Sequence, residues 1–152
     1  MKKTVYVDMD NVLVDFQSGL NQISEELLIE YKDNEDEIPG IFGLMKPLEG
    51  AIESYNWIAE RFDTYILSTA PWLNQSAWSD KPAWVKKYIG KPAYKRLILS
   101  HHKNLLKGDY IIDDRTARGV DKFEGVHIHF GPDGNFKTWP EVIAFLKHIE
   151  GF

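Results

Sequence analysis

The sequence contains no cysteine. Disulfide bonds, thiolate metal sites and a cysteine nucleophile are therefore excluded, and the composition fits a reducing, cytoplasmic compartment. Long apolar runs are also missing, since none reaches the roughly 18 residues of a membrane-spanning helix. The apolar run near the start ends at Asp8, too early for a signal peptide. No association with a membrane is expected.

Positive charge is scarce as well. The 18 lysines and arginines are outnumbered by 23 aspartates and glutamates, and the formal net charge is -5. An acidic protein has no general attraction to nucleic acid, so strong nucleic-acid binding is not expected. An anionic substrate would need positive charge from a few placed lysines or from a metal ion.

The chain of 152 residues suffices for one domain with a sizeable core, and it contains neither repeats nor low-complexity segments. Short apolar segments alternate with longer amphipathic ones. Strands are expected at 4–8, 64–69, 96–100, 109–114 and 126–130. Helices are expected at 17–32, 51–62, 81–89 and 139–149, with Asp80 capping the third and Pro82 in its first turn. This alternation predicts an α/β fold: a three-layer, Rossmann-like, mostly parallel sheet with helices on both faces.

One connection is too long for a simple crossover. From Asn11 to Phe62 there are 52 residues, whereas a crossover between parallel strands needs about a dozen or more. The surplus, residues 16–46, is predicted to form a small helical cap over the edge of the sheet. The α/β core would then consist of residues 1–15 and 47–152.

Aspartates follow two of the expected strands. Asp8 and Asp10 come at the end of the first, and Asp113 and Asp114 at the end of the fourth. Taken alone, an Asp-x-Asp pair is usually a turn or a helix cap. Because ligands bind beyond the carboxyl ends of parallel strands, however, a parallel sheet would bring all four carboxylates to one edge. Carboxylates that converge repel one another unless a hard cation such as Mg²⁺ neutralises them, and Mg²⁺ prefers oxygen ligands.

The ordered set of motifs resembles the haloacid dehalogenase superfamily of phosphotransferases and phosphatases. The matching motifs are DMDNV at 8–12, LST at 67–69, Lys103, and IIDD at 111–114. Within that superfamily the chain is similar to the 5′(3′)-deoxyribonucleotidases. The blocks that carry this similarity are DMDNVLVDF, PLEGAIE, STAP, PAWVKKYIG and IIDDR, which lie between residues 5 and 115.

The resemblance implies a role for each matched residue. Asp8 would attack phosphorus and form an aspartyl-phosphate, while Asp10 would protonate the leaving oxygen and later activate water. Thr69, with Ser68 as the alternative, and Lys103 would hold the phosphate. Mg²⁺ would be bound by Asp8, the Asp10 backbone carbonyl and Asp113, with Asp114 nearby or acting through water. Taken alone, Lys103 reads as a surface lysine, Thr69 as a turn former and Asp114 as an ion-pair partner of Arg115; the ordered set favours the functional interpretation.

Aromatic side chains near these motifs are candidates for a substrate pocket. Trp72 follows Thr69 closely, Phe16 lies just beyond the aspartate pair, and Phe42 lies in the expected cap. A planar base could stack among them. The alternative for each is ordinary core packing.

His127 and His129 would share one face of the last strand, which could indicate a second metal site. No further ligand at a suitable spacing accompanies them, so ordinary strand histidines are the favoured interpretation.

The sequence therefore predicts a Mg²⁺-dependent phosphomonoesterase that acts on deoxyribonucleoside or ribonucleoside monophosphates. One alternative keeps this chemistry with another phosphorylated metabolite or a nucleic-acid end as the substrate. A phosphoacceptor signalling domain and a binding module without turnover are further alternatives. A signalling domain would carry its acceptor on a later strand and would need no cap.

Overall fold

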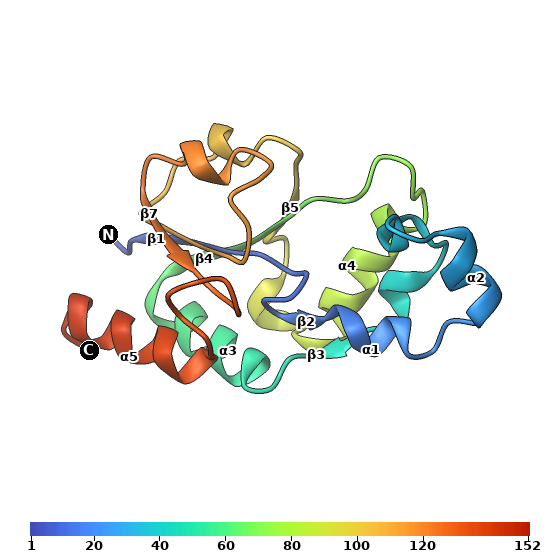
Figure 1. Ribbon diagram of the computed structural model, residues 1–152. Coiled ribbons are helices and arrows are strands. Elements are labelled where there is room, and N and C mark those ends of the chain that lie inside the picture. The colour runs from blue at the N-terminus through green and yellow to red at the C-terminus, as the bar shows by residue number, and fades with distance from the viewer.

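A computed structural model describes residues 1–152, and its centre is a parallel β-sheet. Its strands lie in the order β5-β4-β1-β6-β7, and every neighbouring pair is parallel. The strands are β1 (Thr4–Val7), β4 (Asp63–Ser68), β5 (Leu97–Leu99), β6 (Tyr110–Asp113) and β7 (Val126–His129). All five strands expected from the sequence are confirmed. Because β1 lies between β4 and β6, the carboxyl ends of these three strands are neighbours (Figure 1).

The two faces of the sheet pack against different apolar clusters. Val5, Val7 and Ile112 belong to the main hydrophobic cluster, whereas Tyr6 and Ile111 belong to a smaller one. This division follows from the alternation of side chains along a strand. Both faces are buried, which explains why the strands read as nearly continuous apolar runs.

One face of the sheet is covered by regular helices, which form a layer beside the sheet (Figure 1). They are α3 (Ala51–Arg61), α4 (Ala77–Tyr88) and α5 (Trp139–Glu150). Each contributes residues to the main cluster, for example Tyr55, Trp84 and Val142. None of the helices is long and apolar enough to cross a lipid bilayer.

The other face is covered by the connections at 100–109 and 114–125, which contain only short 3₁₀ turns. These turns are η4 (Lys103–Leu105) and η5 (Val120–Lys122), and Val120 and Phe123 pack against Tyr6 and Ile111. The three-layer α/β fold is confirmed, but the expectation of α-helices on both faces is wrong. The connection 100–109 must carry the chain from β5 past β4 and β1 to β6, so most of its length is used to cross the sheet.

The segment 16–46 folds as a series of short elements. They are α1 (Phe16–Leu20), α2 (Glu25–Glu30), η1 (Glu35–Glu37) and η2 (Ile41–Gly43), and the pair β2 (Val14–Asp15) and β3 (Lys46–Pro47) closes the base. The single helix expected at 17–32 is wrong, because the Ser24 hydroxyl accepts a hydrogen bond from the Leu27 N–H and starts a new helix. Ile38, Ile41 and Met45 belong to the main cluster, so the segment shares its core with the rest of the domain. Its function as a cap stays a prediction.

Helix α4 begins at Ala77, earlier than expected. The side-chain amide of the buried Asn74 donates to the Asp36 and Ile38 carbonyls at 2.9 and 3.1 Å. These hydrogen bonds hold the start of α4 against the segment 16–46. The prediction that Asp80 caps the helix and that Pro82 lies in its first turn is therefore wrong. Pro82 lies inside the helix, where it cannot donate a backbone hydrogen bond.

The C-terminal helix is tied to the loop after β1 by Trp139. Its side chain is 1% exposed and its indole N–H donates to the Val12 carbonyl at 2.8 Å. Trp139→Phe should lower the free energy of unfolding by about 2–4 kcal/mol, because it leaves a buried carbonyl unpaired and a small cavity. Urea denaturation followed by circular dichroism measures this loss.

Trp72→Phe is the matched control, since Trp72 is 78% exposed. Its effect should stay within about 0.5 kcal/mol, as is usual for surface substitutions. Equal effects of the two substitutions would show that the indole hydrogen bond does not stabilise the fold.

Candidate active site

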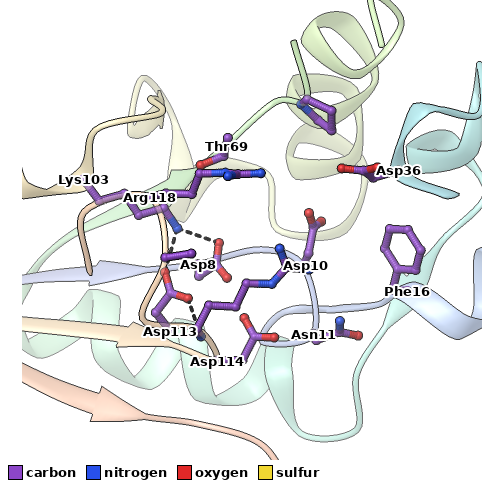
Figure 2. A pocket seen from close by; sticks show the side chains of 13 residues that line it. Asp8, Asp10, Asn11, Phe16, Asp36, Thr69, Lys103, Asp113, Asp114 and Arg118 are labelled. Atoms are coloured by element: carbon purple, nitrogen blue, oxygen red, sulfur yellow. Dashed lines mark hydrogen bonds and ion pairs between the residues drawn. The ribbon is translucent and has the colours of Figure 1, made fainter. Parts of the chain in front are cut away.

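The chain turns sharply after Asp8 instead of continuing the strand. The Asp8 N–H still donates to the Ile112 carbonyl at 2.9 Å, as in the ladder between β1 and β6. Beyond it, the N–H groups of Leu13 and Val14 both donate to the Met9 carbonyl at 2.9 Å. Asn11 has a positive φ of 61°, a conformation that asparagine tolerates better than most residues. The turn brings Asp8 and Asp10 into the lining of the same pocket (Figure 2).

Three aspartates from two strands meet beside this turn. Asp8, Asp113 and Asp114 each offer a carboxylate oxygen, and these atoms lie within 4.8 Å of one another. The meeting follows from the pairing of β1 with β6, which places the ends of both strands side by side. The expectation that a parallel sheet brings these carboxylates to one edge is confirmed.

Lys103 joins this cluster from η4. Its ammonium donates to Asp8 Oδ1 at 3.0 Å and to Asp113 Oδ2 at 2.7 Å (Figure 2). Lys103 is 3% exposed, so this is a buried ion-pair network. Burial opposes the charge on its ammonium, but Asp8 and Asp113 outweigh burial and raise the pKa of Lys103 above its usual range.

The cluster carries more negative charge than Lys103 neutralises. Burial, followed by the neighbouring Asp8 carboxylate, raises the pKa of Asp113 and of Asp114 well above the usual range of a carboxyl group. In addition, Asp114 Oδ1 is buried and has no hydrogen-bond partner. An unpaired buried oxygen among three converging carboxylates fits the donor set of a hard divalent cation.

The two hydroxyl residues at the end of β4 have different surroundings. Thr69 lines the pocket, and its hydroxyl donates to the Ser100 carbonyl at 2.8 Å. Ser68 is fully buried, and its Oγ accepts a hydrogen bond from Lys81 at 2.7 Å. Thr69 is thus the hydroxyl residue that the structure places at the pocket.

The three aromatic candidates for the substrate pocket also lie in different surroundings. Phe16 lines the pocket on the side away from Lys103, near Asp36 (Figure 2). Phe42 is 2% exposed and packs edge-on against Phe16 at 6.0 Å between ring centroids, so it supports the pocket wall from within the core. Trp72 is mostly exposed and contacts His101 instead, next to the pocket-lining Pro71.

Arg118 and Lys81 are site residues that the sequence pattern did not single out. Arg115 and Arg118 line the pocket from the loop after β6, and neither forms an ion pair. The Asp114–Arg115 ion pair considered from the sequence is absent. Lys81 lies behind the pocket wall and pairs with Asp10 at 3.1 Å. Arg118 had no sequence signal beyond its nearness to the IIDDR block, and Lys81 had none beyond its place directly before the PAWVKKYIG block.

The histidines of β7 lie beside the aspartate cluster without entering it. Nε2 of His127 is 3.0 Å from the Asp113 carbonyl, and Nε2 of His129 is 3.1 Å from the Asp114 carbonyl. The cluster whose carboxylate oxygens could hold a metal ion consists of the three aspartates and includes neither histidine. The two histidines therefore support the backbone at the end of β6.

Solved structures with the same fold are hydrolases of the haloacid dehalogenase class. A haloacid dehalogenase-like hydrolase from Streptococcus pneumoniae superposes with a TM-score of 0.66 at 12% identity, covering 95% of this chain and 98% of that chain. A haloacid dehalogenase family hydrolase from Deinococcus radiodurans, solved with bound phosphate and sodium, has a TM-score of 0.54 at 13% identity and covers 98% and 96%. These likenesses define the class of fold.

The sequence comparisons identify the family. Residues 35–143 match the family model described as 5′ nucleotidase, deoxy (pyrimidine), cytosolic type C protein. A protein of Vibrio phage KVP40 named as a 5′(3′)-deoxyribonucleotidase is 55% identical over 95% of this chain and 85% of its own length. The human cytosolic-type 5′(3′)-deoxyribonucleotidase is 28% identical over 78% of this chain and 74% of its own length. The chain belongs to the 5′(3′)-deoxyribonucleotidase family and is a hydrolase of phosphoric monoesters, so the resemblance seen in the motifs is confirmed.

The carboxylate cluster predicts stabilisation by a divalent cation. Mg²⁺ at roughly 100 times its dissociation constant should raise Tm by about 5–10 °C, because it relieves repulsion in the folded state alone. Differential scanning calorimetry with Mg²⁺ and with chelator measures the shift. Asp113→Asn should remove most of it, whereas Asp121→Asn, an exposed aspartate outside the pocket, should leave it intact. A shift of equal size in both variants would place the cation elsewhere.

Proposed function

We propose that the protein is a Mg²⁺-dependent nucleotidase that removes the phosphate of deoxyribonucleoside or ribonucleoside monophosphates through an aspartyl-phosphate intermediate. The observation that carries the proposal is the convergence of Asp8, Lys103, Asp113 and Asp114 at one sheet edge, with Asp10 in the same pocket. A cytoplasmic location belongs to the same proposal; it fits the absence of cysteine and the name of the human relative.

The metal would be held by the side chains of Asp8, Asp113 and Asp114 and by the Asp10 backbone carbonyl. When bound, Mg²⁺ neutralises negative charge on the phosphoryl oxygens and on the nucleophile that approaches them. The unpaired Oδ1 of Asp114 supports this assignment.

The side chains of the pocket would divide the reaction among them. Asp8 would attack phosphorus, which replaces one slow hydrolysis by two easier steps. Asp10 would give its proton to the leaving oxygen and would then take a proton from the attacking water. Burial raises the pKa of Asp10 above its usual range, with Lys81 opposing the shift and Asp8 adding to it, and this favours a carboxyl group that can donate.

Lys103 and Thr69 would hold the phosphoryl group. Lys103 is already ionised and buried beside the nucleophile, so it costs no reorganisation when charge develops. Arg118 adds an unpaired cation to the pocket lining. These groups supply the local positive charge that an acidic protein needs for an anionic substrate.

The nucleoside part would lie toward Phe16. Both curated relatives described above are named for deoxyribonucleotides, and Phe16 is the aromatic ring in the pocket lining. The exposed Trp72 could add a second contact at the rim when substrate is bound. A base that stacks on an aromatic ring gains about 1–3 kcal/mol.

A panel of nucleoside monophosphates and 4-nitrophenyl phosphate, assayed with Mg²⁺ and with chelator, tests the proposal. Phosphate release should require Mg²⁺, Asp8→Asn should abolish it, and Asp10→Asn should reduce it by about 10²–10⁴-fold. A single stoichiometric phosphorylation without turnover would indicate a signalling domain. Binding without reaction would indicate a binding module, and activity confined to non-nucleotide esters would change the substrate class.

The pocket aromatics give a separate prediction. Phe16→Ala should raise KM for a nucleoside monophosphate by about 5–150-fold, the equivalent of one stacking contact, and should change KM for 4-nitrophenyl phosphate much less. The same comparison of KM values for Trp72→Ala tests whether Trp72 contacts the base at the rim of the pocket. Equal changes on both esters would remove the substituted ring from the base site.

A further inference from the structure

Lys81 on α4 is a charged side chain with 0% exposure. Removing an ammonium group from water is expensive unless its charge and its hydrogen bonds are satisfied. Lysine is among the residues least often found fully buried. A side chain of this kind in the middle of a helix needs an explanation beyond packing.

The partners of Lys81 account for all of its donors. Its ammonium donates to Asp10 Oδ1 at 3.2 Å, to Asp10 Oδ2 at 3.1 Å and to Ser68 Oγ at 2.7 Å. The face of the Phe42 ring covers the same ammonium, with 4.4 Å between Nζ and the ring centroid, which is a favourable cation–π distance. Lys81 does not line the pocket, so it cannot bind substrate directly.

Asp10 depends on Lys81 for its orientation. The Asp10 side chain is 26% exposed and lines the pocket, and no other side chain of the protein donates a hydrogen bond to its carboxylate. Asp10 also lies beyond the end of β1 and has only an isolated β-bridge to Val14, so the main sheet does not fix its side chain. Without the ammonium group the carboxylate would be free to rotate about its side-chain bonds.

We propose that Lys81 is a positioning residue that holds the Asp10 carboxyl group in the direction required for proton transfer to the leaving oxygen. The inference rests on the proposed function, because it assigns Asp10 the role of acid and base. Ser68 and Phe42 complete the arrangement by holding Lys81 itself. Through Phe42, the segment 16–46 contributes to the catalytic geometry without contacting the phosphate.

The first half-reaction makes this proposal specific. The bond between phosphorus and the nucleoside oxygen breaks, a bond between phosphorus and Asp8 forms, and the leaving oxygen takes the proton of Asp10, which becomes a carboxylate. A nucleoside alkoxide is a poor leaving group and needs that proton. A 4-nitrophenolate leaves readily without it. Displacing Asp10 should therefore slow the first half-reaction on the nucleotide and spare it on the aryl ester.

Single-turnover kinetics of Lys81→Met with enzyme in excess and Mg²⁺ present test the proposal. Methionine keeps the length of the side chain and removes its charge. The rate of the first turnover should fall by about 10–100-fold on a nucleoside monophosphate, as expected for a displaced catalytic group, and by less than about 3-fold on 4-nitrophenyl phosphate. Lys86→Met, an exposed lysine on the same helix, should change neither rate.

Equal losses on the two substrates, or no loss on either, would overturn the inference. If the wild-type protein hydrolyses neither ester, the proposed function fails and the inference fails with it, whereas an active wild type with equal losses overturns the inference alone. Circular dichroism and the Tm shift caused by Mg²⁺ report whether the variant is folded. If Lys81→Met does not fold, Ser68→Ala replaces it as the test, because it removes one partner of Lys81. The single-turnover rate should fall by about 3–10-fold on the nucleoside monophosphate and stay unchanged on 4-nitrophenyl phosphate. Equal losses on the two esters would again overturn the inference.

Discussion

The structure depends on one buried ammonium group between carboxylates from two neighbouring strands. Lys103 contacts Asp8 and Asp113, which are far apart in the sequence and become neighbours only because β1 pairs with β6. Removing one partner from such a network leaves an unpaired buried charge, at a cost of about 3–5 kcal/mol. The same network leaves a buried oxygen of Asp114 without a hydrogen-bond partner, and the three converging carboxylates could hold a cation at this edge of the sheet. Fold and chemistry therefore rest on the same contacts.

Two buried lysines give the pocket two functionally different ends. Lys103 lies beside the residue proposed to attack phosphorus, and Lys81 lies beside the residue proposed to serve the leaving oxygen. They come from different elements, α4 and η4. Asp8 and Asp10 thus have different ammonium partners, so the two aspartates can have separate roles although a single residue stands between them.

The strands and the aspartate cluster could be predicted from the sequence because their signals are local. Strand ends followed by Asp8 and Asp113 define the site once parallel pairing is assumed. Lys81 could not be predicted, because its burial depends on where α4 begins. A helix that starts after Asp80 leaves Lys81 at an exposed first turn, but Asn74 holds the start at Ala77 and turns Lys81 toward Asp10. The 3₁₀ turns over the second face could not be predicted from helical periodicity either, since they are shorter than one amphipathic repeat.

The hydrogen bond from Trp139 to Val12 has a consequence for the order of assembly. Protein synthesis proceeds from the N-terminus, so the aspartate turn emerges from the ribosome first, and the indole that contacts it lies 127 residues further along the chain. Until that residue is synthesised, the Val12 carbonyl lacks this indole partner. The loop that carries the aspartate pair therefore gains this hydrogen bond only after α5 has been synthesised.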